Sequence, residues 1–234
     1  MKIQSSVALV TGANRGLGLA FAKALVARGA KKVYAAAREP SSIHLPGVVP
    51  LRLDVTDAAQ VAEAARLAGD VQIVVNNAGI ALMSGLLAEG GIAAARAELE
   101  TNVFGPLALS RALAPALKRG GGGAIINVLS VLSWLSFPAL ATYSVSKAAA
   151  WSMTNGLRAE LRGQGTQVLG LHVGFLDTDM GRHAPGPKSS PDDVVRQTLD
   201  ALENGESEIL ADAVTRQVKE GLSAGHGIYL GERA

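Results

Sequence analysis

The sequence predicts an α/β fold in which a doubly wound, parallel sheet of about seven strands is flanked by helices on both faces. Short runs of β-branched and apolar residues alternate with longer segments of helical period along the chain. Several of these runs are apolar throughout, which is typical of parallel strands covered on both faces. The chain has 234 residues, of which 48% are hydrophobic, and this is enough to bury such a sheet within one domain.

The expected strands and helices alternate from the N-terminus onward. The short apolar runs that predict strands are Val7–Val10, Lys32–Ala36, Val49–Leu53, Val71–Val75, Ala124–Leu129, Gln167–Val173 and Glu208–Ala211. The segments that predict helices are Leu17–Arg28, Ala58–Leu67, a long Ala93–Lys118 region, Ser144–Arg162 and Asp192–Glu203. The last helix has a strong start, because Ser190 can cap it and Pro191 suits its first turn. Right-handed crossovers between parallel strands then restrict the topology.

The composition excludes several classes of protein. The 22 Lys and Arg nearly balance the 20 Asp and Glu, so the net charge of +2 gives no support to a nucleic-acid partner, despite a pI near 9.0. Cysteine is absent and the four histidines are isolated in the sequence, so no metal site is expected. No signal-peptide pattern and no suitable membrane span are found, so a cytoplasmic protein without membrane contact is expected.

Glycine is unusually frequent, with 27 residues, and one cluster of glycines lies between the first expected strand and the first expected helix. It reads Thr11-Gly12-Ala13-Asn14-Arg15-Gly16-Leu17-Gly18. A tight turn with bare backbone at a helix N-terminus suits a pyrophosphate group. The cluster therefore predicts a dinucleotide site, and the alternative is a glycine-rich turn that only closes a strand–helix unit.

The end of the second expected strand indicates which dinucleotide is bound. A site for NAD places an acid there, whereas this strand ends at Ala37 and is followed by Arg38. The guanidinium groups of Arg38 and of Arg15, from the glycine cluster, can bind a 2′-phosphate. NADP(H) is therefore favoured over NAD(H), and the alternative is that both arginines are only solvated surface cations.

Two further stretches suit the adenosine half of such a cofactor. Asp54-Val55 follows the third expected strand, where a carboxylate can accept a hydrogen bond from the adenine amino group. Asn76-Asn77-Ala78-Gly79 follows the fourth, and its glycine lets the backbone pass close to the cofactor. Both stretches are also ordinary turn sequences.

The chain resembles the short-chain dehydrogenase/reductase family, of the classical type, over about residues 5–180. The matching motifs stand in the family's order: Thr11–Gly18, Asp54, Asn76–Gly79, Asn102, Ser130, Tyr143-Ser144-Val145-Ser146-Lys147 and Thr178. A Tyr-x-x-x-Lys motif with a serine 13 positions upstream and the glycine cluster is a highly specific combination. The resemblance implies a single Rossmann-type domain over 1–234, with a cofactor half at about 1–120 and a catalytic and substrate half at about 121–234.

The chain departs from the family pattern in three places. Leu129 stands where the family usually has the first of two serines, so only Ser130 remains, at the catalytic spacing. Val173-Gly174 replaces the usual Pro-Gly, which loosens the loop that seats the nicotinamide but removes no reacting group. The part after about Gly181 is the least similar. A lid is expected over about 181–204, beginning with Gly181–Ser189, where Gly and Pro indicate an exposed loop before the helix expected at Asp192–Glu203.

The residue types and the resemblance together assign the catalytic roles. Tyr143 and Lys147 lie four residues apart on one expected helix and share a face. A phenol titrates near 10, so the ammonium of Lys147, together with the cationic nicotinamide, is expected to lower the pKa of Tyr143 for acid–base work near neutrality. Ser130 is expected to bind the substrate oxygen. The resemblance implies that Lys147 also holds the nicotinamide ribose, that Asn102 anchors a water relay to the lysine and that Thr178 binds the nicotinamide carboxamide.

The substrate pocket is expected among apolar residues that follow the cofactor and catalytic motifs. These residues are Met83, Val131, Trp134, Phe137, Leu140, Phe175 and Met180. No charged anchor for a carboxylate or phosphate stands out, so an apolar ketone, aldehyde or secondary alcohol is the expected substrate. The alternative for each of these residues is a place in the core.

These features predict an NADP(H)-dependent oxidoreductase that transfers hydride between nicotinamide and a small carbonyl or alcohol substrate. The resemblance also implies a homodimer or homotetramer, formed through the helices that carry Asn102 and Tyr143. A non-catalytic dinucleotide-binding sensor with the same fold is the main alternative, and intact Ser130, Tyr143 and Lys147 argue against it. An epimerase or dehydratase of nucleotide sugars is less favoured, because such relatives are longer.

Overall fold

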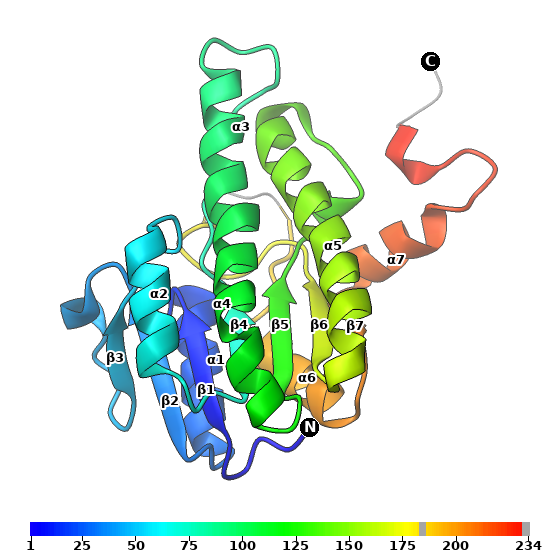
Figure 1. Cartoon of the computed structure of the whole chain (residues 1–234). Helices are drawn as coiled ribbons and strands as arrows, with labels where there is room; N and C mark the ends of the chain where they lie inside the picture. The colour runs from blue at the N-terminus through cyan, green and yellow to red at the C-terminus, as the bar shows by residue number, and fades with distance from the viewer. Residues whose placement is uncertain (183–185, 231–234) are drawn as a thin grey trace.

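Figure 1 shows the computed structural model of the chain, which describes residues 1–182 and 186–230. Seven parallel strands form one sheet in the order β3-β2-β1-β4-β5-β6-β7. Their bounds are β1 Val7–Thr11, β2 Lys32–Ala37, β3 Val49–Arg52, β4 Ile73–Asn76, β5 Ala124–Val128, β6 Gln167–His172 and β7 Glu208–Leu210. The predicted Rossmann-type α/β fold is confirmed.

Helices cover both faces of this sheet (Figure 1). Their bounds are α1 Gly16–Ala27, α2 Ala58–Leu67, α3 Gly91–Leu99, α4 Gly105–Arg119, α5 Ala141–Leu161, α6 Pro191–Glu203 and α7 Ala213–Gly221. Short 3-10 turns lie at Pro40–Ser42, Val131–Ser133, Pro138–Leu140, Arg162–Gln164 and Ile228–Leu230. No helix within the described ranges has both the length and the apolar character needed to cross a membrane.

Two apolar layers hold the helices against the sheet. Helices α1 and α6 pack on one face through fully buried side chains such as Phe21, Leu25 and Leu199. Helices α2, α4 and α5 pack on the other face, where Leu109 and Leu113 are fully buried. All five residues of β1 are buried because helices cover both of its faces, as its unbroken apolar sequence predicts.

The strand order reverses direction at β1, which pairs with β2 on one side and with β4 on the other. In open parallel sheets, ligands bind outside the carboxyl ends of the strands at such a reversal. The glycine cluster follows β1 directly, and the predicted catalytic residues follow β5 or lie on the first turns of α5. The topology therefore gathers them at one edge of the sheet.

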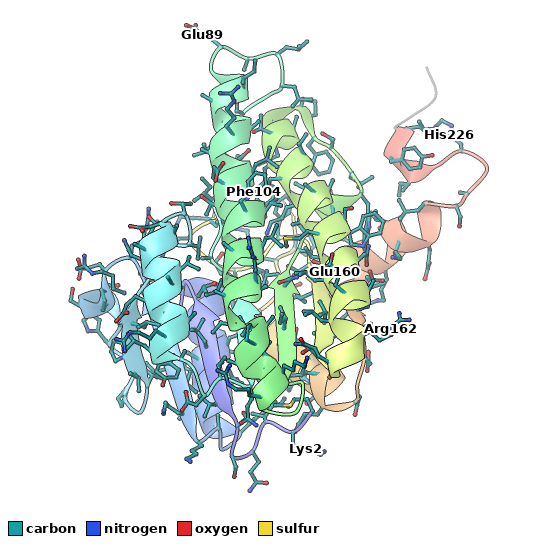
Figure 2. The ribbon with its side chains drawn as sticks, in the orientation of Figure 1. Lys2, Glu89, Phe104, Glu160, Arg162 and His226 are labelled. Atoms are coloured by element: carbon teal, nitrogen blue, oxygen red, sulfur yellow. The ribbon has the colours of Figure 1, made fainter. Side chains whose placement is uncertain are left out.

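The long helix predicted at Ala93–Lys118 is continuous but not uniform. A π-helical turn, Glu100–Phe104, joins α3 to α4 and contains Asn102. π-turns widen the backbone locally and are frequent at functional sites. Figure 2 shows Phe104 on this long helix and Glu89 at the tip above it.

The predicted lid at about 181–204 is only partly a surface loop. From Pro191 onward the chain is helix α6. Its residues Val194, Val195 and Leu202 are fully buried against α1 and the sheet. This part of the lid prediction is wrong, because the apolar face of α6 is needed to cover the sheet. The loop before it is closed by a parallel bridge between Leu176 and Ser189, and residues 183–185 of the predicted lid lie outside the described residues.

Candidate active site

The glycine cluster forms a tight turn that is pinned to the end of β4. Gly12 and Gly16 have φ values of 65° and 54°, a region that favours glycine. The Thr11 hydroxyl accepts hydrogen bonds from the backbone N–H groups of Asn77 and Ala78, both at 2.9 Å. The Asn77 amide donates back to the Thr11 carbonyl at 2.9 Å. Asn77 is therefore a structural part of the loop that motif reasoning passed over, although it stands within the quoted Asn76–Gly79 stretch.

The N-terminus of α1 has the features of an anion site. Its N-cap residue, Arg15, makes no capping hydrogen bond with its side chain. The first backbone N–H groups of the helix, at Gly16, Leu17 and Gly18, have no carbonyl within the helix to bind. A Cβ atom at Gly18 would stand 2.2 Å from the Gly12 carbonyl oxygen, so only glycine permits this close packing of helix and loop. The cradle therefore fits the pyrophosphate of a dinucleotide.

The two arginines predicted to bind a 2′-phosphate have different surroundings. Arg15 Nη1 lies 3.1 Å from Asp179 Oδ2, so this guanidinium bridges the glycine loop to the loop after β6. Arg38 is exposed at the end of β2 and makes no hydrogen bond or ion pair with any residue in the described part of the chain. The two predicted arginines therefore differ. Arg15 is paired with Asp179, whereas the guanidinium of Arg38 remains available to bind a 2′-phosphate.

The residues predicted around the adenosine half are also divided. Asp54 is half-buried, and its Oδ1 already accepts from the Thr56 hydroxyl at 2.7 Å. The Val55 side chain is buried against Gly105, the first residue of α4. Gly79 and Ala78 lie half-buried beside the glycine loop. The structure therefore leaves one Asp54 carboxylate oxygen and the backbone of this stretch to face a ligand.

Asn76 is not brought to the surface of the cleft. Its amide donates to Asn127 Oδ1 at 2.8 Å and to the Ser110 hydroxyl at 3.1 Å, and the residue is buried. Its Oδ1 atom has no hydrogen-bond partner among the described residues. Because β4 turns this side chain toward α4, the cofactor contact of Asn76 stays a prediction and would fall to its backbone.

Ser130, Tyr143 and Lys147 converge at the carboxyl end of β5. Ser130 caps a short turn over Val131–Ser133, with its Oγ 3.1 Å from the Leu132 nitrogen, and its hydroxyl lies near enough to the phenol of Tyr143 to act on the pKa of that phenol. Lys147 is buried, its Nζ donates to the Val128 carbonyl at 2.8 Å, and it lies 5.5 Å from the centre of the Tyr143 ring. These three of the predicted catalytic residues are therefore brought together.

Asn102 links this group to the loop after β4. Its Oδ1 accepts from the Ile80 N–H and its amide donates to the Ile80 carbonyl, each at 2.9 Å. The same amide donates to the Ser146 hydroxyl, next to Lys147, at 2.9 Å. A small cavity of about 10 Å³ lies among Asn76, Asn102 and Lys147, which is room for about one water molecule.

The charges around the phenol differ from the expectation. Burial first, and then the charge of Glu98, raise the pKa of Tyr143, while the Ser130 hydroxyl acts in the opposite direction. Burial lowers the pKa of Lys147 to about 8. The predicted lowering of the phenol pKa by Lys147 is therefore not found in the chain alone, because the ammonium faces the Val128 carbonyl and is itself partly desolvated.

Glu98 is a functional candidate that the motifs did not indicate. This carboxylate is fully buried on α3, one turn before Asn102, and its Oε1 accepts from the Leu82 N–H at 2.7 Å. Its Oε2 has no hydrogen-bond partner among the described residues. The only signal in the sequence is an acid at a helical position that otherwise packs. That this acid is buried shows only once α3 is packed against α5.

Replacing Lys147 with Met is expected to stabilise the fold at pH 7 while it removes turnover. Because burial lowers the pKa of Lys147 from 10.5 to about 8, burying its charge costs about 3 kcal/mol of folding free energy. Methionine removes that cost but leaves the Val128 carbonyl without this donor, so a net gain of about 1 to 2 kcal/mol is expected. Denaturant unfolding of both proteins at pH 7 measures it.

The pH dependence of this gain has a definite sign. Below pH 8 the lysine is charged in both states and the whole cost is present. Between pH 8 and 10.5 the unfolded chain binds the proton and the folded chain does not, so the stability of the wild type rises with pH. The advantage of the Met variant should therefore shrink toward pH 10. A difference that stays constant over this range would contradict the burial of a charged lysine.

The missing proline was expected to loosen the loop after β6, but a side chain holds this loop in place. Asp212 Oδ2 accepts from the Gly174 N–H at 2.6 Å, and Val173 is buried in the core. Thr178 is half-buried, and its methyl group would be 3.4 Å from a Cβ atom placed on Gly16. The loop therefore meets the glycine cluster, as a nicotinamide-binding segment requires, and Asp212 replaces the restraint that a proline would give.

The predicted substrate residues separate into packed and exposed groups. Trp134 and Val131 are buried in a small core cluster with Val218, which favours the alternative of a core position, and their place in a substrate pocket stays a prediction. Leu140 and Phe175 are half-buried, and Phe137, Met83 and Met180 are exposed. A shallow hollow of about 570 Å³ lies elsewhere, at the tip formed by residues 86–96, and contains none of the predicted site residues.

No three side chains of His, Asp or Glu gather as a metal site within residues 1–182 and 186–230. His172 is fully buried in β6, whereas His226 lies on the C-terminal arm, away from the sheet (Figure 2). His183 lies outside the described residues.

Comparison with known proteins decides the family. A family model described as short chain dehydrogenase matches residues 6–187. The chain belongs to the short-chain dehydrogenase family. Among curated relatives of this family, the 3-oxoacyl-acyl-carrier-protein reductase FabG of Salmonella typhimurium is 35% identical over 191 residues, which are 78% of this chain and 78% of that protein. For three other curated relatives, which are 30–34% identical, the match covers only 45–64% of their length.

Solved short-chain dehydrogenase structures share the whole architecture. A short chain dehydrogenase from Burkholderia cenocepacia in complex with NADP is 45% identical, with a TM-score of 0.92 and coverage of 96% of this chain and 95% of that one. The NADPH-bound carbonyl reductase from chicken fatty liver is 29% identical, with a TM-score of 0.79 and coverage of 89% and 100%. The predicted membership of the short-chain dehydrogenase family is therefore confirmed.

Proposed function

We propose that this short-chain dehydrogenase is an NADP(H)-dependent oxidoreductase that reduces apolar ketones or aldehydes and oxidises the matching secondary or primary alcohols. The observation that carries the proposal is the contact of Ser130, Tyr143 and Lys147 beside a glycine loop shaped for pyrophosphate. The NADP-bound and NADPH-bound relatives support the cofactor. No observation favours a non-catalytic sensor.

The residues present fit the nicotinamide dinucleotide. The free N–H groups at the start of α1 would hold the pyrophosphate, Arg38 the 2′-phosphate, and Thr178 with Gly174 the nicotinamide end. When bound, the nicotinamide ring supplies or accepts the hydride. The chain supplies the binding of the substrate oxygen and the proton.

Ser130 and Tyr143 would act on the substrate oxygen. Both are at the same end of β5, and the serine hydroxyl, which lies beside the phenol, can donate to a carbonyl oxygen as negative charge develops on it. Because burial and Glu98 raise the pKa of Tyr143, the chain's own groups keep the phenol protonated. This suits Tyr143 to give its proton to the oxygen, which is the step that carbonyl reduction needs.

Lys147 and Asn102 would return the proton to Tyr143. A lysine with a pKa of about 8 can exchange protons near neutral pH. The 10 Å³ cavity beside Asn102 offers room for a water molecule that would also satisfy the buried Oδ1 of Asn76. This geometry supports the relay that the family resemblance implied.

A substrate panel tests the proposed function. Ketones, aldehydes, sugars and 3-oxoacyl thioesters would each be offered with NADPH and, in parallel, with NADH, and the loss of reduced-cofactor absorbance recorded. Turnover of apolar ketones or aldehydes is the expected result, since the exposed residues near the loops, Phe137, Met83 and Met180, are apolar. Activity confined to acyl-carrier-protein thioesters, the substrate named for the Salmonella relative, or to sugars would overturn the substrate class.

Replacing Arg38 with Asp is expected to weaken NADPH binding about 10- to 100-fold and to improve NADH binding, because a charge-assisted contact is worth about 1.5 to 3 kcal/mol. Arg38 has no competing partner among the described residues, so its loss should not disturb the fold. Fluorescence titration with each cofactor measures the ratio. Arg119→Asp, the same charge change at the exposed end of α4, serves as the control and should leave both affinities unchanged.

The assembly is a separate proposal. The outer faces of α4 and α5 expose Leu107 and Val145, next to Phe104 of the π-turn. A second copy of the chain would cover these side chains in a homodimer or homotetramer, and sedimentation equilibrium measures the state. The cytoplasmic location stays a prediction.

A further inference from the structure

One buried histidine has no role in the proposed chemistry but lies directly behind it. His172, the last residue of β6, is fully buried. Its ring stacks on the Trp134 indole, with ring centres 4.0 Å apart and an angle of 17° between the planes. The Trp134 ring in turn meets Trp151 edge-on at 6.0 Å. The imidazole is therefore held in one orientation by packing.

Both ring nitrogens of His172 face oxygen atoms that can accept a hydrogen bond but cannot donate one. Nδ1 lies 3.3 Å from the carbonyl oxygen of Ser130, and Nε2 lies 3.3 Å from Glu208 Oε1. The Nδ1 contact is a hydrogen bond. The Nε2 contact is close enough for an ion pair but does not have the geometry of a hydrogen bond. A carbonyl and a carboxylate are acceptors only, whereas a neutral imidazole has a single N–H. Only the imidazolium ion offers a proton to both neighbours.

The charges around the ring agree with a cation at this place. The contact with His172 is the largest cause that lowers the pKa of Glu208 to about 2, so this carboxylate is ionised at neutral pH. Lys219 of α7 lies 3.0 Å from the other Glu208 oxygen and 4.7 Å from the centre of the Trp134 ring. From α5, Arg158 interacts with Glu208 electrostatically. Glu208 is therefore the acid shared by the cations on this side of the sheet.

The backbone that His172 contacts belongs to the turn that carries the catalytic hydroxyl. The Ser130 carbonyl also accepts from the Ser133 N–H at 3.0 Å, and the Val131 N–H donates to the Val173 carbonyl at 3.0 Å. The Leu129 N–H also donates to the Leu171 carbonyl at 2.7 Å, so the chain is fixed to β6 and its following residue on both sides of Ser130. A ring nitrogen with a lone pair would repel the carbonyl oxygen and loosen one of these attachments.

We propose that His172 is a positioning residue, held as the imidazolium ion between Glu208 and the Ser130 carbonyl, which fixes the Ser130 hydroxyl against the substrate oxygen. This rests on the role proposed for Ser130. Glu208 supplies the counter-charge, and β7 with α7 thereby becomes part of the support of the active site. Loss of the Nδ1 donor would shift the serine turn and lower the rate without touching the cofactor.

Nitrogen NMR of the whole protein labelled at histidine tests the charge state directly. His172→Gln identifies the His172 signals among the four histidines of the chain. The expected result is that both His172 nitrogens carry a proton at pH 7, and that Glu208→Gln leaves only one of them protonated. Glu206→Gln, an exposed acid two residues earlier, is the matched control and should leave the signals unchanged. A singly protonated His172 in the wild type at pH 7 would overturn the proposal.

A split between kcat and KM then separates positioning from a merely structural role. Relative to the wild type, His172→Leu should lower kcat about tenfold at pH 7, with the KM for NADPH unchanged, because it removes the donor to the Ser130 carbonyl and a small displacement of a catalytic group is enough. A fall in kcat that is matched by an equal rise in the KM for NADPH would refute the positioning role. If the wild type reduces no carbonyl at all, the proposed function fails, while the NMR result still decides the state of His172.

Discussion

Replacing Tyr143 with Phe is expected to lower kcat about 10³- to 10⁴-fold, since general acid catalysis contributes up to that much. The phenol hydroxyl is the only group removed, and the neighbouring Ser130 retains its hydrogen bond from the Leu132 N–H. The fold should therefore be kept. NADPH affinity should change less than about twofold, because the ring still packs beside Lys147.

Single-turnover measurements of NADPH oxidation, with cofactor affinity measured separately by fluorescence, distinguish this loss from a binding defect. Tyr34→Phe is the control, because Tyr34 is also buried and hydrogen-bonded, to the Leu67 carbonyl and to Asp70, but lies on β2 away from the catalytic residues. It should keep full activity. Unchanged turnover in the Tyr143 variant would remove the acid–base role from this residue.

Replacing Gly18 with Ala is expected to abolish useful NADPH binding and to destabilise the fold. The added methyl group would stand 2.2 Å from the Gly12 carbonyl oxygen and 2.5 Å from the Asn77 amide. Neither is a flexible side-chain end, because Asn77 is tied to the Thr11 carbonyl. Helix α1 must therefore move away from the glycine loop, which costs about 1 to 3 kcal/mol and displaces the N–H groups that face the pyrophosphate.

Gly156→Ala provides the matched control on α5, where a new Cβ atom would meet nothing within 4 Å. It should stabilise the protein by about 0.5 to 1 kcal/mol, because alanine loses less backbone entropy than glycine in a helix. Denaturant unfolding and NADPH titration measure both variants. A Gly18 variant that binds NADPH with normal affinity would show that the close approach of helix and loop is not required.

Much of the fold was predictable because its signals are local. Apolar runs predicted all seven strands to within about two residues, since a strand covered on both faces needs side chains of that kind. The bounds of α2 are those predicted, where Asp57 caps the helix by accepting from the N–H groups of Ala59 and Gln60. The long helix before β5 was predicted as one element, and its π-turn at Glu100–Phe104 was not, because no local pattern marks such a turn.

The candidate site was predictable where its chemistry depends on spacing along the chain. Tyr143 and Lys147 share a helix face, and the structure brings Ser130 to them from the end of the neighbouring strand. The position of Trp134 was not predictable, because an aromatic residue after a catalytic serine can belong to a pocket or to the core. Its burial in a cluster with Val131 and its stacking on His172 favour the core.

The sequence by itself determined the sheet, the glycine loop and the catalytic spacing, because hydrophobic period, backbone freedom and helical repeat act between near neighbours in the chain. Tertiary structure alone decided how the charged and polar groups are paired. Arg15 meets Asp179, Asp212 holds Gly174, and His172 lies between Ser130 and Glu208, partners that stand 36 to 164 positions apart. Such pairs depend on which strand ends and loops the parallel topology places side by side, and on how far burial removes water from them.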